Sequence, residues 1–242
     1  MTDRKRVAVC VSGHLRQVKQ GFAAFIRNVI SPNIDRFDFD FFIDTWDQGD
    51  WRSPPGEQRN LGMLDPEIID WIRQHIKPPA FRIQQPIPWD TSRYDPYIKP
   101  GHQKKGTRGE HILGMYYKIM RANELKSDHE RTLGFEYDTV MRWRTDFAFK
   151  EPLILAGELA DDRVYDAVWV PEHKNNSDDW LFDAFAMGDS NSMNNYSVAF
   201  WALDIHIFGN RVFRPEPLLR YHMDHESIRV GILSSGWEIL RA

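Results

Sequence analysis

The sequence predicts an α/β fold in which a mostly parallel sheet is flanked by helices. Apolar, β-branched segments alternate with segments of helical periodicity through most of the 242 residues. The first apolar segment, residues 6–13 (RVAVCVSG), is apolar on both faces, as expected of an inner strand of a parallel sheet. The length and a hydrophobic content of 42% suit a single domain spanning residues 1–242.

Each element follows from its local pattern. The predicted strands are residues 6–13, 37–47, 80–86, 137–149 and 167–172. The predicted helices are residues 17–32, 65–76, 111–131, 192–208 and a last one that begins at 215 and runs into a strand by 230. Pro32 is expected to end the first helix, while Asp65 and Pro66 are typical of an N-cap and first helical position.

Residues 84–110 differ in composition, being rich in proline, glycine and charge, and they predict a long flexible loop. Within it, residues 101–107 (GHQKKGT) carry two glycines at phosphate-loop spacing, but Lys-Ser/Thr does not follow Gly106, so a P-loop is excluded. The sequence contains neither G-x-G-x-x-G nor G-x-S-x-G. Dinucleotide binding and serine-hydrolase chemistry therefore have no support.

Charge and cysteine content exclude further classes. The net charge of −4 gives no basic field for nucleic acid, so no nucleic-acid partner is expected. The single cysteine, Cys10, excludes a disulfide framework and a cysteine-rich zinc site. No apolar run approaches the ~20 residues of a transmembrane segment, and the N-terminal one is too short for a signal peptide. We therefore expect a cytoplasmic protein.

The first candidate site, residues 12–16 (SGHLR), lies between the first strand and the first helix. Gly13 permits close backbone approach, and the helix N-terminus beyond it favours an anion. Arg16 is suited to a charge-assisted contact with phosphate. The segment is either an anion site that includes Ser12 or a turn beside a surface arginine.

The second candidate is residues 142–146 (RWRTD), at the end of the fourth strand. On a continuous strand Arg142, Arg144 and Asp146 would share one face. Charged residues on a buried strand are costly unless paired. This segment is therefore either a self-satisfied Arg–Asp pair or a site for a charged ligand and a divalent metal.

Other acidic groups are weaker candidates. Asp38 and Asp40 form an Asp-x-Asp pattern, but they precede their strand and are interpreted as a solvated strand entry. Asp44 and Asp47 lie at the exit of the same strand, where ligands of parallel sheets bind.

Two clusters occur late in the chain. Asp183, together with Asp178 and Asp179, lies among aromatic residues and is either a ligand-binding or a capping and turn group. His222 and Glu226 are four residues apart on a predicted helix, which suits either a metal pair or a solvated helix face.

Seven segments occur in an order that resembles a known family. They are VAVCVSGHLR, FDFFIDTWD, MYYKIMRANEL, GFEYDTVMRWRTDFAF, VWVPE, DAFAMGDSNSMNNYS and PEPLLRYHM. The set resembles bacterial and large-virus glycosyltransferases of polysaccharide and lipopolysaccharide biosynthesis with a GT-A-like, Rossmann-like fold.

The resemblance implies a hexosyl- or related sugar transferase. It implies a nucleotide-sugar donor at the carboxyl edge of the sheet, often with Mn²⁺ or Mg²⁺, and a glycan or lipid-linked sugar acceptor. In this interpretation Ser12, Gly13, Arg16, Asp44 and Arg142 belong to the donor site, with Arg144 on the diphosphate. Asp183 is the candidate base.

The sequence departs from the family at the metal site. Arg144-Thr145-Asp146 stands where an Asp-x-Asp is expected, so either Asp146 binds a metal, with His222 as a second candidate ligand, or Arg144 supplies the charge instead. Lys104, Lys105 and Arg108 form either a closing loop over the diphosphate or an ordinary surface loop.

Two other classes remain open. One is a catalytically inactive nucleotide-sugar-binding protein on the same fold. The other is a transferase of another activated group, such as a sulfotransferase, for which no phosphate loop is visible.

Overall fold

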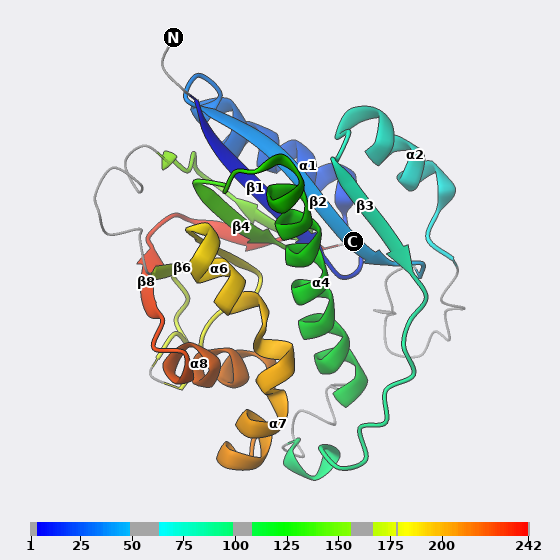
Figure 1. The fold of residues 1–242 in the computed structure, drawn as a ribbon, viewed down its shortest axis with the longest axis vertical. Coiled ribbons are helices and arrows are strands. Elements are labelled where there is room, and N and C mark those ends of the chain that lie inside the picture. Colours follow the sequence, from blue (N-terminus) through cyan, green and yellow to red (C-terminus); the bar gives the residue numbers. More distant parts are fainter. Residues whose placement is uncertain (1–3, 49–62, 99–107, 156–166, 178, 242) are drawn as a thin grey trace.

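A computed structural model describes residues 4–48, 63–98, 108–155, 167–177 and 179–241. Its centre is a seven-stranded sheet with the strand order β3-β2-β1-β4-β7-β6-β8 (Figure 1). The strands of this sheet are β1 (Lys5–Ser12), β2 (Phe37–Trp46), β3 (Ala80–Gln84), β4 (Thr139–Trp143), β6 (Ala167–Pro171), β7 (Phe185–Gly188) and β8 (Arg229–Leu233). A second sheet pairs β5 (Phe147–Phe149) with β9 (Trp237–Ile239).

The sheet is mostly parallel, as the sequence predicts. β3, β2, β1 and β4 run parallel, as do β6 and β8, whereas β7 is antiparallel to both of its neighbours. The chain builds outward from β1 to β2 and β3, then returns to place β4 on the other side of β1. The order therefore reverses between β1 and β4, which is where open α/β sheets bind ligands at the carboxyl ends of their strands.

Helices cover both faces of the sheet. The helices are α1 (Val18–Phe25), α2 (Pro66–His75), α4 (Gly109–Leu133), α6 (Ser190–Ser197), α7 (Ala199–Asn210) and α8 (Pro215–His225). Short helical turns occur at η1 (Ile26–Ile30), η2 (Ser31–Asn33) and η3 (Asp95–Tyr97). α1 and α2 pack on one face, and α4, α6, α7 and α8 pack on the other.

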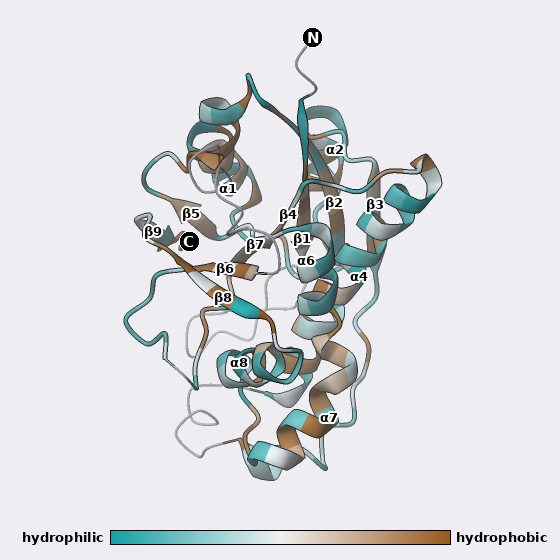
Figure 2. Ribbon diagram, turned by 60° about the vertical axis from the view of Figure 1, so that its left-hand side comes forward, coloured by the Kyte–Doolittle hydropathy of each residue, from teal (hydrophilic) through white to brown (hydrophobic). Residues whose placement is uncertain are grey.

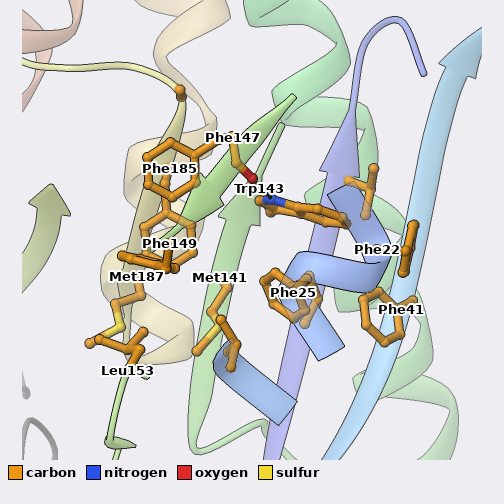
Figure 3. Close-up of a cluster of buried hydrophobic side chains, with 14 of the residues drawn as sticks. Phe22, Phe25, Phe41, Met141, Trp143, Phe147, Phe149, Leu153, Phe185 and Met187 are labelled. Atoms are coloured by element: carbon orange, nitrogen blue, oxygen red, sulfur yellow. Dashed lines mark hydrogen bonds between the residues drawn. The ribbon is translucent and has the colours of Figure 1, made fainter. Parts of the chain in front are cut away.

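The core under α1 is aromatic (Figure 3). Phe22 and Phe25 of α1 contact Trp143 of β4, with ring centroids 4.8 and 4.6 Å apart. The indole Nε1 of Trp143 donates a hydrogen bond of 2.9 Å to the carbonyl oxygen of Phe147. This packing fixes the end of β4 and the following turn against α1, so one arm of the candidate site rests on a rigid support.

Several sequence predictions are confirmed. β1 lies inside the sheet with β2 on one side and β4 on the other. Asp65 caps α2 by accepting a hydrogen bond of 2.9 Å from the Glu67 amide, and Pro66 is the first helical residue. The strand at Ala80–Gln84 and the passage from α8 into β8 also occur as predicted.

Other predictions were wrong in their boundaries. The strand predicted at 137–149 is two strands, since β4 ends at Trp143 and β5 begins at Phe147. The helix predicted at 192–208 is divided at Val198 into α6 and α7. By contrast, the helix predicted at 17–32 is confirmed, because α1, η1 and η2 form one continuous helical stretch from Val18 to Asn33 with Pro32 in its last turn.

Candidate functional site

The turn after β1 is tightly constrained. Gly13 has φ of +90°, in the region that favours glycine, and its amide donates a hydrogen bond of 3.1 Å to the Asp44 carbonyl at the end of β2. The Arg16 amide then bonds to the His14 carbonyl at 2.9 Å. The chain thus bends sharply before α1 and presents Arg16 at the carboxyl edge of the sheet.

The turn after β4 lies beside it. The Phe147 amide bonds to the Arg144 carbonyl at 2.8 Å, which closes a four-residue turn. The Thr145 hydroxyl donates to the Arg16 carbonyl at 2.6 Å, and the Leu240 amide donates to the Asp146 carbonyl at 2.7 Å. This turn is therefore tied to the β1–α1 connection on one side and to the end of β9 on the other.

A glycine of α1 permits this approach. A Cβ built on Gly21 would lie 1.9 Å from the Thr145 carbonyl oxygen and 3.4 Å from the Trp143 ring. Any side chain here would push the turn off the helix. Sequence reasoning missed Gly21, because a glycine inside a predicted helix carries no signal about what packs on it.

Four charged side chains meet across these turns. Arg144 donates from Nε to Asp146 Oδ1 at 2.5 Å, and its Nη1 lies 3.6 Å from Asp183 Oδ1. Arg16 Nη1 lies 3.7 Å from Asp146 Oδ2. We call Arg16, Arg144, Asp146 and Asp183 the switch-point cluster. The structure thus brings Arg16, Arg144 and Asp146 together from the carboxyl ends of β1 and β4, and adds Asp183 from the segment before β7.

The carboxylates of the cluster are more buried than its arginines. The side chain of Asp146 is 2% exposed, whereas those of Arg16 and Arg144 are 13% and 17% exposed. Burial lowers the pKa of Arg144, but the charges of Asp183 and Asp146 outweigh burial and raise it. The Arg144 guanidinium is therefore held as a cation, with part of its side chain exposed to solvent.

Arg142 does not share a face with the other two residues as predicted. It lies within β4, is fully buried, and donates from Nη1 to the Asp183 carbonyl. β4 ends at Trp143, so Arg144 and Asp146 lie in the turn and the predicted strand alternation stops before them. Burial lowers the pKa of the Arg142 guanidinium, which supports the backbone of Asp183 rather than facing solvent.

Polar groups without a partner lie near Arg142. The Nε of Arg142, the hydroxyl of Tyr196 and the hydroxyl of Ser12 are buried and form no hydrogen bond within the described chain. Burial is the main cause that raises the pKa of Tyr196, to about 12; Asp183 adds to it and Arg142 opposes it. Tyr196 therefore stays protonated and remains a hydrogen-bond donor.

Glu216 extends the site from α8. Its carbonyl accepts a hydrogen bond of 3.3 Å from the Leu181 amide, and its carboxylate lies 3.1 Å from Arg214 Nε. Burial raises the pKa of Glu216, and the charge of Asp183 raises it further. Nothing in the local sequence pattern of Glu216 or Arg214 connects either residue to Asp183.

The Asp44 carboxylate is paired with two cationic side chains of the protein. Its Oδ1 accepts from Lys118 Nζ at 2.5 Å, and its Oδ2 accepts from Arg82. Lys118 also donates to the Thr45 carbonyl at 3.0 Å and lies 3.9 Å from the centre of the Trp46 ring. Asp44 and Lys118 are fully buried, so this group joins β2, β3 and α4 and offers no open oxygen to a donor.

His222 lies on the face of α8 that meets α6 and α7. Its Nε2 is 2.7 Å from the Asn195 carbonyl oxygen and its Nδ1 is 3.2 Å from His206 Nε2. Since a carbonyl only accepts, His222 carries its proton on Nε2 and accepts from His206 on Nδ1. Both nitrogens are occupied by the protein, which leaves neither for a metal.

The residues of the cluster do not fit a divalent metal. In the described part of the chain, no group of three or more His, Cys, Asp and Glu side chains is arranged to hold a metal ion. Asp146, the candidate ligand, instead carries guanidiniums of Arg16 and Arg144 on its two oxygens. Arg144 hydrogen-bonds one of these oxygens, and both guanidiniums repel a further cation.

The remaining candidates lie apart from this cluster or outside the described residues. Lys104, Lys105 and Asp178 are outside the described residues. Arg108 pairs with Glu110 at 3.5 Å. Asp179 accepts a hydrogen bond of 2.6 Å from the Ser177 hydroxyl in an exposed turn.

Comparison with protein-family models gives no match, and comparison with curated protein sequences gives none either. Among the described helices, none combines the length and the apolar character needed to cross a bilayer.

Proposed function

We propose that this chain is a glycosyltransferase with a GT-A-like fold that moves a sugar from a nucleotide-sugar donor to a glycan or lipid-linked acceptor. The observation that carries the proposal is the switch-point cluster. It places two guanidiniums and two carboxylates at the carboxyl ends of β1 and β4, where the strand order reverses. The order of the sequence segments, which resembles that of such transferases, supports the same assignment.

The arginines suit a departing diphosphate. In glycosyl transfer the bond between the anomeric carbon and the phosphate oxygen breaks, and negative charge grows on the diphosphate. Arg16 and Arg144 can offer N–H donors to that charge, and planar guanidiniums bind phosphate oxygens in pairs. Asp146 lies behind them and fixes their geometry before the donor binds, so little reorganisation is needed.

We further propose that catalysis does not require Mn²⁺ or Mg²⁺. Arg16 and Arg144 already contact Asp146, the carboxylate that would hold the ion. We therefore assign neutralisation of the leaving group to the arginines.

The carboxylates suit activation of the acceptor. As the new bond forms between the acceptor oxygen and the anomeric carbon, the acceptor hydroxyl proton must pass to a base. We assign this role to Asp183, which lies 3.6 Å from Arg144 and therefore close to the reacting phosphate in this account. Glu216, whose pKa is raised by burial and by Asp183, is the neighbouring group able to hold a proton at higher pH than an exposed glutamate.

The test is a turnover assay with a panel of nucleotide sugars and saccharide acceptors. Release of nucleoside diphosphate is measured once in EDTA and once with added Mn²⁺. Asp183→Asn should retain donor binding while turnover falls by about 10²–10⁴. Asp179→Asn is the matched control, because Asp179 is an exposed carboxylate four residues before Asp183 and accepts a hydrogen bond from the Ser177 hydroxyl in an exposed turn. Its turnover should equal that of the wild type.

Two results would contradict the proposal. One is a requirement for Mn²⁺ that no arginine substitution alters, which would assign neutralisation of the leaving diphosphate to a metal ion. The other is donor binding without turnover for every donor and acceptor tested, which would favour the catalytically inactive binding protein.

A further inference from the structure

Helix α7 exposes apolar side chains in a continuous stripe. Trp201 is 71% exposed, Ile205 is 60% exposed and Phe208 is 42% exposed. With Val198 just before the helix, they recur at intervals of three and four residues, so they lie on one helical face. We call these four residues the α7 stripe.

The opposite face of α7 is buried. Leu203, His206 and Ile207 pack into the core formed with α4 and α8. A helix that is apolar on all sides is normally covered on all sides. On the outer side the four stripe residues remain 39–71% exposed, although the Phe208 ring also contacts Tyr94 and Tyr97. Figure 2 shows α7 with much of its ribbon in the hydrophobic colour at one end of the molecule.

The charged side chains next to the α7 stripe carry no net negative charge. Asp204 is the only acidic residue of α7, and both of its oxygens lie 3.0 Å from Arg93 Nη2. The Tyr94 hydroxyl donates to the same carboxylate. Arg211, exposed at the C-terminal end of α7, adds a positive charge. The helix therefore presents apolar side chains next to a cation.

The size of the stripe argues against a second copy of the chain. Its exposed area is on the order of 400 Å², within the range of functional patches but about half of what each partner buries in a stable protein interface. An exposed tryptophan beside aliphatic residues, with an arginine at the helix end, is instead typical of helices that lie in the interface of a bilayer.

We propose that the α7 stripe docks the protein on the surface of a lipid bilayer, with Trp201 and Ile205 entering the boundary between headgroups and acyl chains and Arg211 facing anionic headgroups. Residues 211–214 connect α7 directly to α8, whose first turn carries Glu216. Docking would therefore hold one arm of the candidate site near the membrane surface. That consequence, acceptance of a lipid-linked saccharide, rests on the proposed function, whereas the docking itself does not.

The test is flotation of the full chain with vesicles, without donor or acceptor. Vesicles of phosphatidylcholine with phosphatidylglycerol should carry the wild-type protein to the top of the gradient, and phosphatidylcholine alone should carry less. The double substitution Trp201→Ser and Ile205→Ser should reduce the bound-to-free ratio by about tenfold or more. Both side chains are exposed, so the melting temperature should stay that of the wild type.

Leu133→Ser is the matched control, because Leu133 is 59% exposed at the end of α4 and belongs to no stripe. Its binding to vesicles should equal that of the wild type. Three results would overturn the proposal. They are wild-type protein that stays at the bottom with both vesicles, equal flotation of the double variant, and light scattering that shows a wild-type dimer which the double substitution separates.

Discussion

Gly21→Ala tests whether close contact between α1 and the turn after β4 maintains the candidate site. The added methyl would lie 1.9 Å from the Thr145 carbonyl oxygen, where ordinary contact begins near 3.4 Å. The oxygen belongs to the backbone, so either the turn or the helix must shift by more than 1 Å, a distance that follows from those two values.

The stability effect is the difference of two terms. Replacing glycine by alanine inside a helix stabilises by about 1 kcal/mol. Overpacking a filled contact costs roughly 1–3 kcal/mol and more when backbone must move. Because the clash involves a carbonyl that cannot rotate away, we expect a net loss of about 1–2 kcal/mol in the free energy of unfolding. For a domain of this size, that lowers the melting temperature by roughly 2–8 °C.

The functional effect should be larger than the stability effect. Thr145 lies between Arg144 and Asp146, so a shift of the turn displaces both charged groups. A misplacement of about 1 Å costs on the order of 10² in turnover. Calorimetric melting and the transferase assay would be run on the same protein.

Gly209→Ala is the matched control for Gly21→Ala. Gly209 is also helical, in α7, and nothing lies within 4 Å of its added Cβ. It should leave turnover unchanged and raise the melting temperature slightly. A Gly21→Ala protein that melts at or above the wild-type temperature with full turnover would refute the packing argument.

Further predictions concern buried ionisable groups. Burial, with the adjacent His222, lowers the pKa of His206 from 6.5 to about 4, so its contribution to stability is present above pH 6.5 and is lost as pH falls toward 4. Urea unfolding should show a loss of roughly 3 kcal/mol over that window, much reduced in His206→Gln; equal acid sensitivity of both proteins would contradict the assignment. Cys10, whose pKa burial raises to about 12, should react with a thiol reagent only on unfolding, so rapid reaction of the folded protein would count against its buried placement. Lys118→Met leaves Asp44 with one cation and should cost about 3 kcal/mol of unfolding free energy, whereas an unchanged midpoint would show that the pair adds nothing.

The sequence predicted the parallel half of the fold because its signals are local. β1 is an uninterrupted apolar run, and α2 begins with an aspartate cap followed by proline. β7 was missed because it has only four residues, Phe185–Gly188, between Asp183 and Asp189. Its pairing with β4 and β6 comes from distant segments, and an antiparallel insertion carries no local signal.

The site was predictable in its members and less so in its geometry. Arg16 and Asp146 could be placed together because the carboxyl ends of adjacent parallel strands meet at one edge. The turn at Arg144 was read as strand, because flanking aromatic residues favour extended structure and the closing bond to Phe147 is invisible in the sequence. The engagement of Asp44 by Lys118 depends on α4, 74 residues away, which no spacing rule connects to β2.

The central claim is that the arginines of the switch-point cluster hold a nucleoside diphosphate without a metal. The most direct measurement is titration calorimetry of the four common nucleoside diphosphates in EDTA with the wild type, Arg16→Gln and the exposed control Arg131→Gln. We predict that one diphosphate binds the wild type and the control equally, and that Arg16→Gln weakens it by about 10–100-fold, the value of a charge-assisted hydrogen bond. Equal affinity of Arg16→Gln, or no binding of any diphosphate to the wild type, would contradict the account.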